Sequence, residues 1–246
     1  LSLWILEAGG PGLGVIEAWQ VTVIVVALGE ALAREGSEQN EQECAHGRGG
    51  CNAAVAGSPG MSLFRQCAGL FVVGFPGLSP EPEIEALIDE GVGGVILFKR
   101  NVDSATQVAG LVRELKSRAG RPLLTSVDQE GGRVARLRGP PFTALPPMRV
   151  LGQSGDAELV ERAGRLLAHE LRALGFDLDF APVLDVDTHP ANPVIGDRSF
   201  HRDAPEVARL GVALGRGLEA GGVASCGKHF PGHGDTTLDS HLDLPS

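Results

Sequence analysis

Cysteine is scarce in this sequence of 246 residues, and the four cysteines lie far apart. They are too few and too scattered for a disulfide scaffold, no C-x-x-C pair occurs, and a reducing compartment is the simplest interpretation. We expect each thiol to be inert and mostly buried, as free cysteines usually are. The four residues are Cys44, Cys51, Cys67 and Cys226.

Runs of basic residues and long apolar runs are also absent. The net charge of −10 argues against a nucleic-acid partner, because a phosphate backbone needs a basic surface. The longest apolar run, residues 21–28, is much shorter than the roughly 20 residues of a membrane span. No Lys or Arg precedes it, although a signal peptide would require one. We predict neither a span nor a signal, and therefore a cytoplasmic protein.

Residues 1–60 differ in composition from the remainder. They hold both Trp residues and seven Glu but no Asp, Lys or Phe, and a Gly- and Ala-rich stretch, residues 47–60, ends them. Met61 then precedes a strand-like apolar segment. We predict that residues 1–60 are an extension or linker outside the native domain, and that residues 61–246 form the domain. The alternative for the first part is a short amphipathic helix over residues 15–34.

From residue 61 onward, apolar strand-like runs alternate with helical patterns. The runs suit buried parallel strands, and the segments between them carry apolar residues at helical spacing. Strand and helix in regular alternation predict right-handed βα units around one sheet. The expected strands are residues 70–75, 94–98, 123–128, 178–183 and 223–230, and the expected helices are residues 81–90, 104–119, 158–174 and 204–220.

This alternation fits either a (β/α) barrel or a doubly wound sheet. The position of the charged residues separates these two folds. Three successive strands end in charged residues: Asp128, Asp185, and the pair Lys228 and His229. Polar residues gather at the carboxyl ends of several strands in a (β/α)8 barrel of the TIM type. No G-x-G-x-x-G follows the first strand, as a dinucleotide-binding fold would require. We therefore predict a TIM-type barrel, of which this sequence supplies about the first five βα units.

The segment from Lys228 to His241 concentrates titratable residues. Pro231, Gly232 and Gly234 prevent a helix there, so the segment is predicted to be a loop at the end of a strand. On an extended chain residues i and i+2 point the same way, so Asp239 could hold one ring nitrogen of His241 and leave the other free. A histidine oriented in this way can donate and then accept a proton near neutral pH.

Five ordered segments together resemble the N-terminal catalytic barrel of glycoside hydrolase family 3, most closely its bacterial β-N-acetylglucosaminidase branch. The likeness runs from about Cys67 to the end of the sequence. It rests on GVILF at 94–98, VDQEGGRV at 127–134, FAPVLDV at 180–186, GDRSF at 196–200 and the segment 228–241.

The resemblance implies hydrolysis of terminal β-linked N-acetylglucosamine with retention of configuration, in peptidoglycan turnover, without a cofactor or a metal. It implies His241 as acid/base and Asp239 as the residue that orients it. Sugar hydroxyls would be bound by Asp128, Arg198, Lys228 and His229. Arg133 and Asp185 would support the site from behind, with simple structural pairing as the alternative. The partner is then a small carbohydrate, either a muropeptide or a chitin fragment.

Several alternatives stay open at this stage. Asp128 and Arg198 could form a structural ion pair with each other. His229, His233 and His241 could form a zinc site with nearby carboxylates, although Pro231 and Gly232 preclude the helix that usually aligns such ligands. The protein could also be a β-glucosidase-type member of the family.

The resemblance also places the covalent nucleophile, an Asp, at the end of a seventh strand, beyond residue 246. The 246 residues alone are therefore expected to lack hydrolase activity and to leave a sheet edge unpaired. A catalytically inactive protein that only binds sugar is the alternative function.

Overall fold

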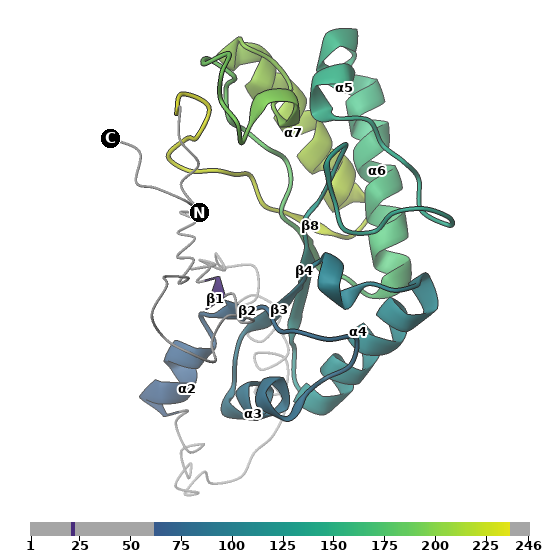
Figure 1. Ribbon diagram of the computed structural model, residues 1–246, viewed down its shortest axis with the longest axis vertical. Helices are drawn as coiled ribbons and strands as arrows, with labels where there is room; N and C mark the ends of the chain where they lie inside the picture. Colours follow the sequence, from purple (N-terminus) through teal and green to yellow (C-terminus); the bar gives the residue numbers. More distant parts are fainter. Residues whose placement is uncertain (1–20, 23–61, 237–246) are drawn as a thin grey trace, which may run out of the picture.

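The computed structural model describes residues 21–22 and 62–236. Within these residues the chain forms one main sheet, with helices packed against it (Figure 1). The strands are β1 (Val21–Thr22), β2 (Val72–Val73), β3 (Gly94–Leu97), β4 (Leu124–Val127), β5 (Gln129–Gly131), β6 (Val134–Ala135), β7 (Leu178–Asp179) and β8 (Ala224–Ser225). The α-helices are α2 (Leu63–Ala68), α3 (Pro82–Glu90), α4 (Ala105–Ala119), α5 (Met148–Ser154), α6 (Ala157–Leu174) and α7 (Ala204–Ala220), with 3-10 turns at Lys99–Asn101 and Gly196–Arg198.

The sheet has the order β1-β2-β3-β4-β7-β8. The pairs from β2 to β8 are all parallel, and only β1 runs antiparallel, against β2. The five predicted strands are thus confirmed in order and direction as β2, β3, β4, β7 and β8, and β1 is a sixth strand that the sequence did not predict. Val21–Thr22 is extended, so the alternative helix over residues 15–34 is wrong at these two residues; the other predictions for residues 1–60 lie outside the described residues.

The regular pairing is shorter than the sequence predicts, because irregular segments and a hairpin follow the strands at their carboxyl ends. After β4 the chain turns into the β5–β6 hairpin, which the sequence analysis missed. After β7 and β8 the two segments stay in contact irregularly: the amide of Lys228 donates to the carbonyl of Pro182, and Val183 and Lys228 form an isolated bridge. This irregular region carries the charged residues.

Helices α3 to α7 cover one face of the sheet and enclose the core, whereas α2 has no buried residue. Val95 and Leu97 of β3 belong to the same buried cluster as residues of α4, α6 and α7, whereas Ile96 belongs to a second cluster on the opposite face. This alternation is the period-two pattern of a strand buried on both faces. The four predicted helices are confirmed to within one residue at each end.

Glycines allow α6 and α7 to approach closely. A Cβ atom on Gly217 would lie 2.2 Å from the carbonyl oxygen of Glu161, and one on Gly164 would lie 2.4 Å from that of Leu214. Both distances are far inside van der Waals contact, so no larger residue fits without separating the two helices. The pairing fixes α7, and with it the start of β8.

The described residues form an open sheet and no closed barrel. β8 stands last in the sheet order, with no strand paired on its other side within residues 62–236. This is the arrangement expected of part of a (β/α)8 barrel. None of the described helices is long and apolar enough to serve as a membrane span.

Candidate functional site

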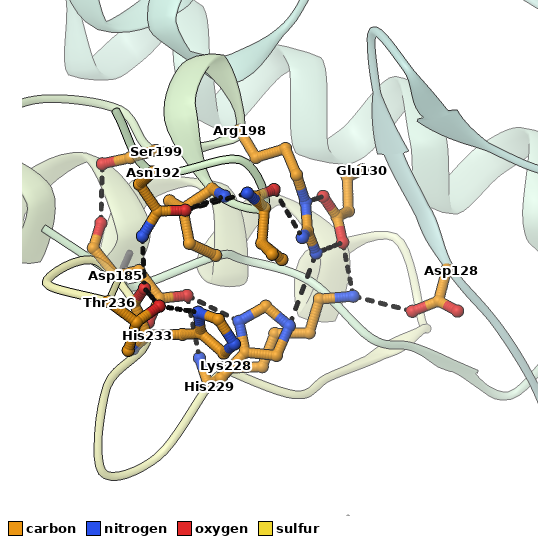
Figure 2. A network of polar contacts seen from close by, with 12 residues as sticks. Asp128, Glu130, Asp185, Asn192, Arg198, Ser199, Lys228, His229, His233 and Thr236 are labelled. Atoms are coloured by element: carbon orange, nitrogen blue, oxygen red, sulfur yellow. Dashed lines mark hydrogen bonds and ion pairs between the residues drawn. The ribbon is translucent and has the colours of Figure 1, made fainter. Parts of the chain in front are cut away.

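Charged side chains meet at the carboxyl ends of β4, β7 and β8, as Figure 2 shows. Lys228 is the centre of the cluster. Its Nζ atom lies 2.7 Å from Asp128 Oδ1 and 2.5 Å from Glu130 Oε1, and only 4% of its side chain is exposed. A buried ammonium group needs charged partners, and these two carboxylates supply them.

Arg198 is bound by Glu130 rather than by Asp128. Its Nε and Nη2 atoms donate to the two carboxylate oxygens of Glu130 at 2.9 and 2.8 Å, in a bidentate pair. Asp128 instead pairs with Lys228 and accepts from Nη2 of Arg136 at 3.1 Å. The alternative of a direct Asp128–Arg198 ion pair is therefore wrong.

The third part of the cluster is the pair of His229 and Asp185. Nδ1 of His229 lies 2.6 Å from Asp185 Oδ2, and Nε2 lies 3.4 Å from Nη2 of Arg198. A proton on Nδ1 would be donated to the carboxylate, which leaves Nε2 as an acceptor that faces the guanidinium group. Asp185 is fully buried at its side chain and also accepts from the backbone amides of His229 and His233.

The mutual pairing keeps the central groups charged. Burial by itself raises the pKa of Asp128 and of Glu130, but the nearby cations outweigh it and hold both values below the ordinary range. Burial likewise lowers the pKa of Lys228, yet the two carboxylates leave it above its ordinary value. Burial lowers the pKa of His229, and Asp185 offsets this only in part, so the imidazole stays neutral at neutral pH.

Asp179 lies behind this cluster and differs from the other acids. Its side chain is fully buried, its Oδ1 atom accepts from the amide of Gln129 at 2.9 Å, and its Oδ2 atom has no hydrogen-bond partner in the described structure. Burial raises the pKa of Asp179 well above its ordinary value. Asp179 thus holds the backbone between Asp128 and Glu130 through its hydrogen bond to Gln129, and its burial favours the protonated acid.

Arg133 lies outside the cluster, in contact with the turn that precedes Arg198. It pairs with Asp197 at 3.1 Å and donates to the carbonyl groups of Pro193, Val194 and Ile195. Its contacts hold the turn and reach no member of the charged cluster. Asp185, by contrast, is a member of the cluster, because it binds His229 directly.

The predicted acid/base pair, Asp239 and His241, lies outside the described residues. His233 is described, and its Nδ1 atom lies 2.9 Å from Thr236 Oγ1. Among residues 62–236, no three His, Cys, Asp or Glu side chains are grouped so that they could hold a metal ion. The zinc alternative that includes His241 therefore stays untested.

Glu130, Arg136 and Asn192 were not singled out from the sequence. Glu130 follows Asp128 by two residues, so strand alternation could have placed both on one side. Arg136 returns to Asp128 only because β5 and β6 form a hairpin, and Asn192 contacts residues 41 positions away. Local sequence patterns do not predict such contacts between residues that are distant in the sequence.

A parallel sheet with buried, paired charges at the carboxyl ends of its strands is typical of α/β-barrel enzymes. Residues 68–246 match the family described as the glycosyl hydrolase family 3 N terminal domain, and the chain belongs to this family.

A β-hexosaminidase from Neisseria meningitidis serogroup C is 52% identical over 173 residues, which cover 67% of this chain and 47% of that protein. The chain thus spans about half the length of the curated relatives it matches.

Two solved structures extend the comparison. A glycoside hydrolase family 3 β-N-acetylglucosaminidase from Paenibacillus sp. str. FPU-7 superposes with a TM-score of 0.73 at 46% identity, over 75% of this chain and 36% of that one. NagZ from Neisseria gonorrhoeae, in complex with N-trifluoroacetyl-D-glucosamine, superposes with a TM-score of 0.65 at 46% identity, over 70% of this chain and 52% of that one.

Proposed function

We propose that this chain belongs to a β-N-acetylhexosaminidase that removes terminal non-reducing β-linked N-acetylglucosamine. The observation that carries the proposal is the buried cluster of Lys228, Glu130, Arg198 and Asp128 at the carboxyl ends of parallel strands. The names of the relatives, β-hexosaminidase and β-N-acetylglucosaminidase, support the same substrate class.

The cluster has the chemistry that sugar recognition needs. Asp128 is 15% exposed at its side chain, so a carboxylate oxygen can accept from a sugar hydroxyl group. Arg198 is 11% exposed and offers N–H groups to hydroxyl oxygens. Both side chains are already held by buried partners, and a site that is fixed in advance loses less entropy when the sugar binds.

His241 is proposed as the general acid and then the general base, with Asp239 as the residue that orients it. In a retaining mechanism this group protonates the leaving oxygen and later activates the attacking water. The covalent nucleophile is assigned to no residue of this sequence. We therefore expect the 246 residues alone to bind the sugar without turning it over.

We further propose that the protein acts in the cytoplasm on muropeptides from peptidoglycan, with chitin fragments as the second substrate. Residues 1–60 are proposed to lie outside the catalytic domain. The family comparison, which begins at residue 68, supports this division.

Hydrolysis of aryl glycosides by the protein made from its natural gene tests the proposal. We expect the protein to release the aryl group from a β-N-acetylglucosaminide. The rate of release from the matching β-glucoside should be at least about tenfold lower. Equal or preferential cleavage of the glucoside would favour the β-glucosidase alternative, and cleavage of neither would favour a protein that only binds sugar.

A further inference from the structure

Asn192 lies between two segments that both reach the charged cluster. One is the turn from Val194 to Arg198, and the other is the strand-end segment from Lys228 to Thr236. Figure 2 shows the Asn192 side chain in the space between them. The residue is only 8% exposed, so its amide group must find its partners within the protein.

The oxygen of the Asn192 amide holds the turn. Oδ1 accepts from the backbone amides of Val194 and Ile195 at 2.9 and 2.8 Å. The carbonyl of Val194 in turn accepts from Nη1 of Arg198 at 3.1 Å. The position of the Arg198 guanidinium group therefore depends on the same turn that Asn192 caps.

The nitrogen of the same amide holds the strand-end segment. Nδ2 donates to the carbonyl of His233 at 2.7 Å, and the amide of His233 donates to Asp185 Oδ1 at 2.6 Å. Because Asp185 also binds His229, and His229 faces Arg198, the contacts form a closed ring that begins and ends at Asn192.

We infer that Asn192 is a positioning residue, which fixes the segment around His233 relative to the Arg198 turn. The inference rests on the proposed function, because that segment leads in sequence to Asp239 and His241. Only a side chain with one acceptor and one donor can make both contacts, and asparagine supplies them at the required reach. Aspartate would keep the acceptor and lose the donor.

The chain also offers a matched control. Oγ1 of Thr188 donates to the carbonyl of Gly234 at 3.3 Å, so its hydrogen bond reaches the same segment and not the Arg198 turn. A contact of this length is weaker than the 2.7 Å bond from Asn192. Thr188→Val therefore removes one hydrogen bond to the segment and leaves the bridge intact.

Amide hydrogen exchange of Asn192→Asp and Thr188→Val, measured on this chain, tests the bridge directly. In Asn192→Asp the His233 carbonyl loses its donor, so the segment opens more often and we expect the His233 amide, still bonded to Asp185, to exchange at least about fivefold faster. The amides of Val194 and Ile195 should change little. Thr188→Val should leave all three amides within about twofold of the wild type. Asn192→Ala should accelerate exchange at both ends, because it removes acceptor and donor together.

Turnover by the protein made from its natural gene tests the consequence. Asn192→Asp should lower kcat for an aryl β-N-acetylglucosaminide about tenfold, with KM within about threefold, because the Arg198 end is preserved. The inference would be overturned if Asn192→Asp left exchange of the His233 amide unchanged or accelerated exchange throughout the chain. It would also be overturned if Thr188→Val changed exchange of the His233 amide as much as Asn192→Asp does. If the wild type neither binds nor cleaves the sugar, the proposed function fails, and the exchange pattern still decides whether Asn192 bridges the two segments.

Discussion

Lys228 and Glu130 are joined at 2.5 Å between Nζ and Oε1, with 4% and 2% of their side chains exposed. Glu130 also holds Arg198 through two hydrogen bonds, so one carboxylate neutralises parts of two cations. This pairing connects the end of β8 to the turn that carries Arg198.

Glu130→Gln should therefore destabilise the fold strongly. The amide keeps the shape of the side chain but leaves two buried cations short of a counter-charge, a change that costs about 3–5 kcal/mol in buried pairs. Denaturant unfolding measures the loss in free energy of unfolding. Glu161→Gln is the control, because its pair with Arg165 is largely exposed and should contribute less than about 1 kcal/mol. Equal effects of the two substitutions would contradict the assignment.

The strands, the helices and most of the charged residues at the strand ends could be predicted from the sequence, because they depend on local sequence patterns. Strand and helix periodicity depends on neighbouring residues, and three of the five predicted strands end at or close to the charged residues of the cluster, at Asp128, Asp185 and Lys228. The choice of partners could not be predicted, because Glu130 and Arg198 are 68 positions apart. Which carboxylate meets which cation depends on the path of the chain beyond the strand ends, and tertiary packing decides that path.

Asp179→Asn should make the protein more stable at neutral pH. Burial raises the pKa of Asp179 in the folded state, so between the unfolded pKa near 3.8 and the folded value the native state holds the extra proton. The free energy of unfolding therefore falls as pH rises through this window, by up to roughly 1.4 kcal/mol per pH unit. The neutral side-chain amide of the Asp179→Asn variant removes that pH dependence. Unfolding at a series of pH values from 4 to 8 should show a gap between variant and wild type that widens with pH. A constant gap would mean that Asp179 is ionised.

The imidazole of His229 should titrate below its ordinary pKa of 6.5. Burial lowers its pKa, and the hydrogen bond to Asp185 opposes this. Asp185→Asn should consequently move the midpoint lower still, because the carboxylate that favours the protonated ring is gone. Histidine NMR shifts against pH give both midpoints. A wild-type midpoint above 6.5, or an upward movement in the variant, would be incompatible with the neutral, acceptor role of Nε2.

Two helical glycines should respond to alanine in opposite directions. Gly217→Ala would place a Cβ atom 2.2 Å from the carbonyl oxygen of Glu161, so α6 and α7 must separate and stability should fall by about 1–3 kcal/mol. Gly110→Ala in α4 meets nothing within 4 Å and should stabilise by up to about 1 kcal/mol through helix propensity. Thermal unfolding of both variants measures the two changes in stability. A stabilising effect of Gly217→Ala would refute the close approach of the two helices.

The cluster around Lys228 is proposed to bind N-acetylglucosamine. Isothermal titration of the sugar into the wild type and Asp128→Asn tests this proposal most directly, with circular dichroism to confirm that both proteins are folded. We predict one site per chain in the wild type and at least about tenfold weaker binding in the variant, because a hydrogen bond to a charged group contributes about 1.5–3 kcal/mol. Equal affinity in the two proteins, or no binding by the wild type, would show that the cluster is not the sugar site.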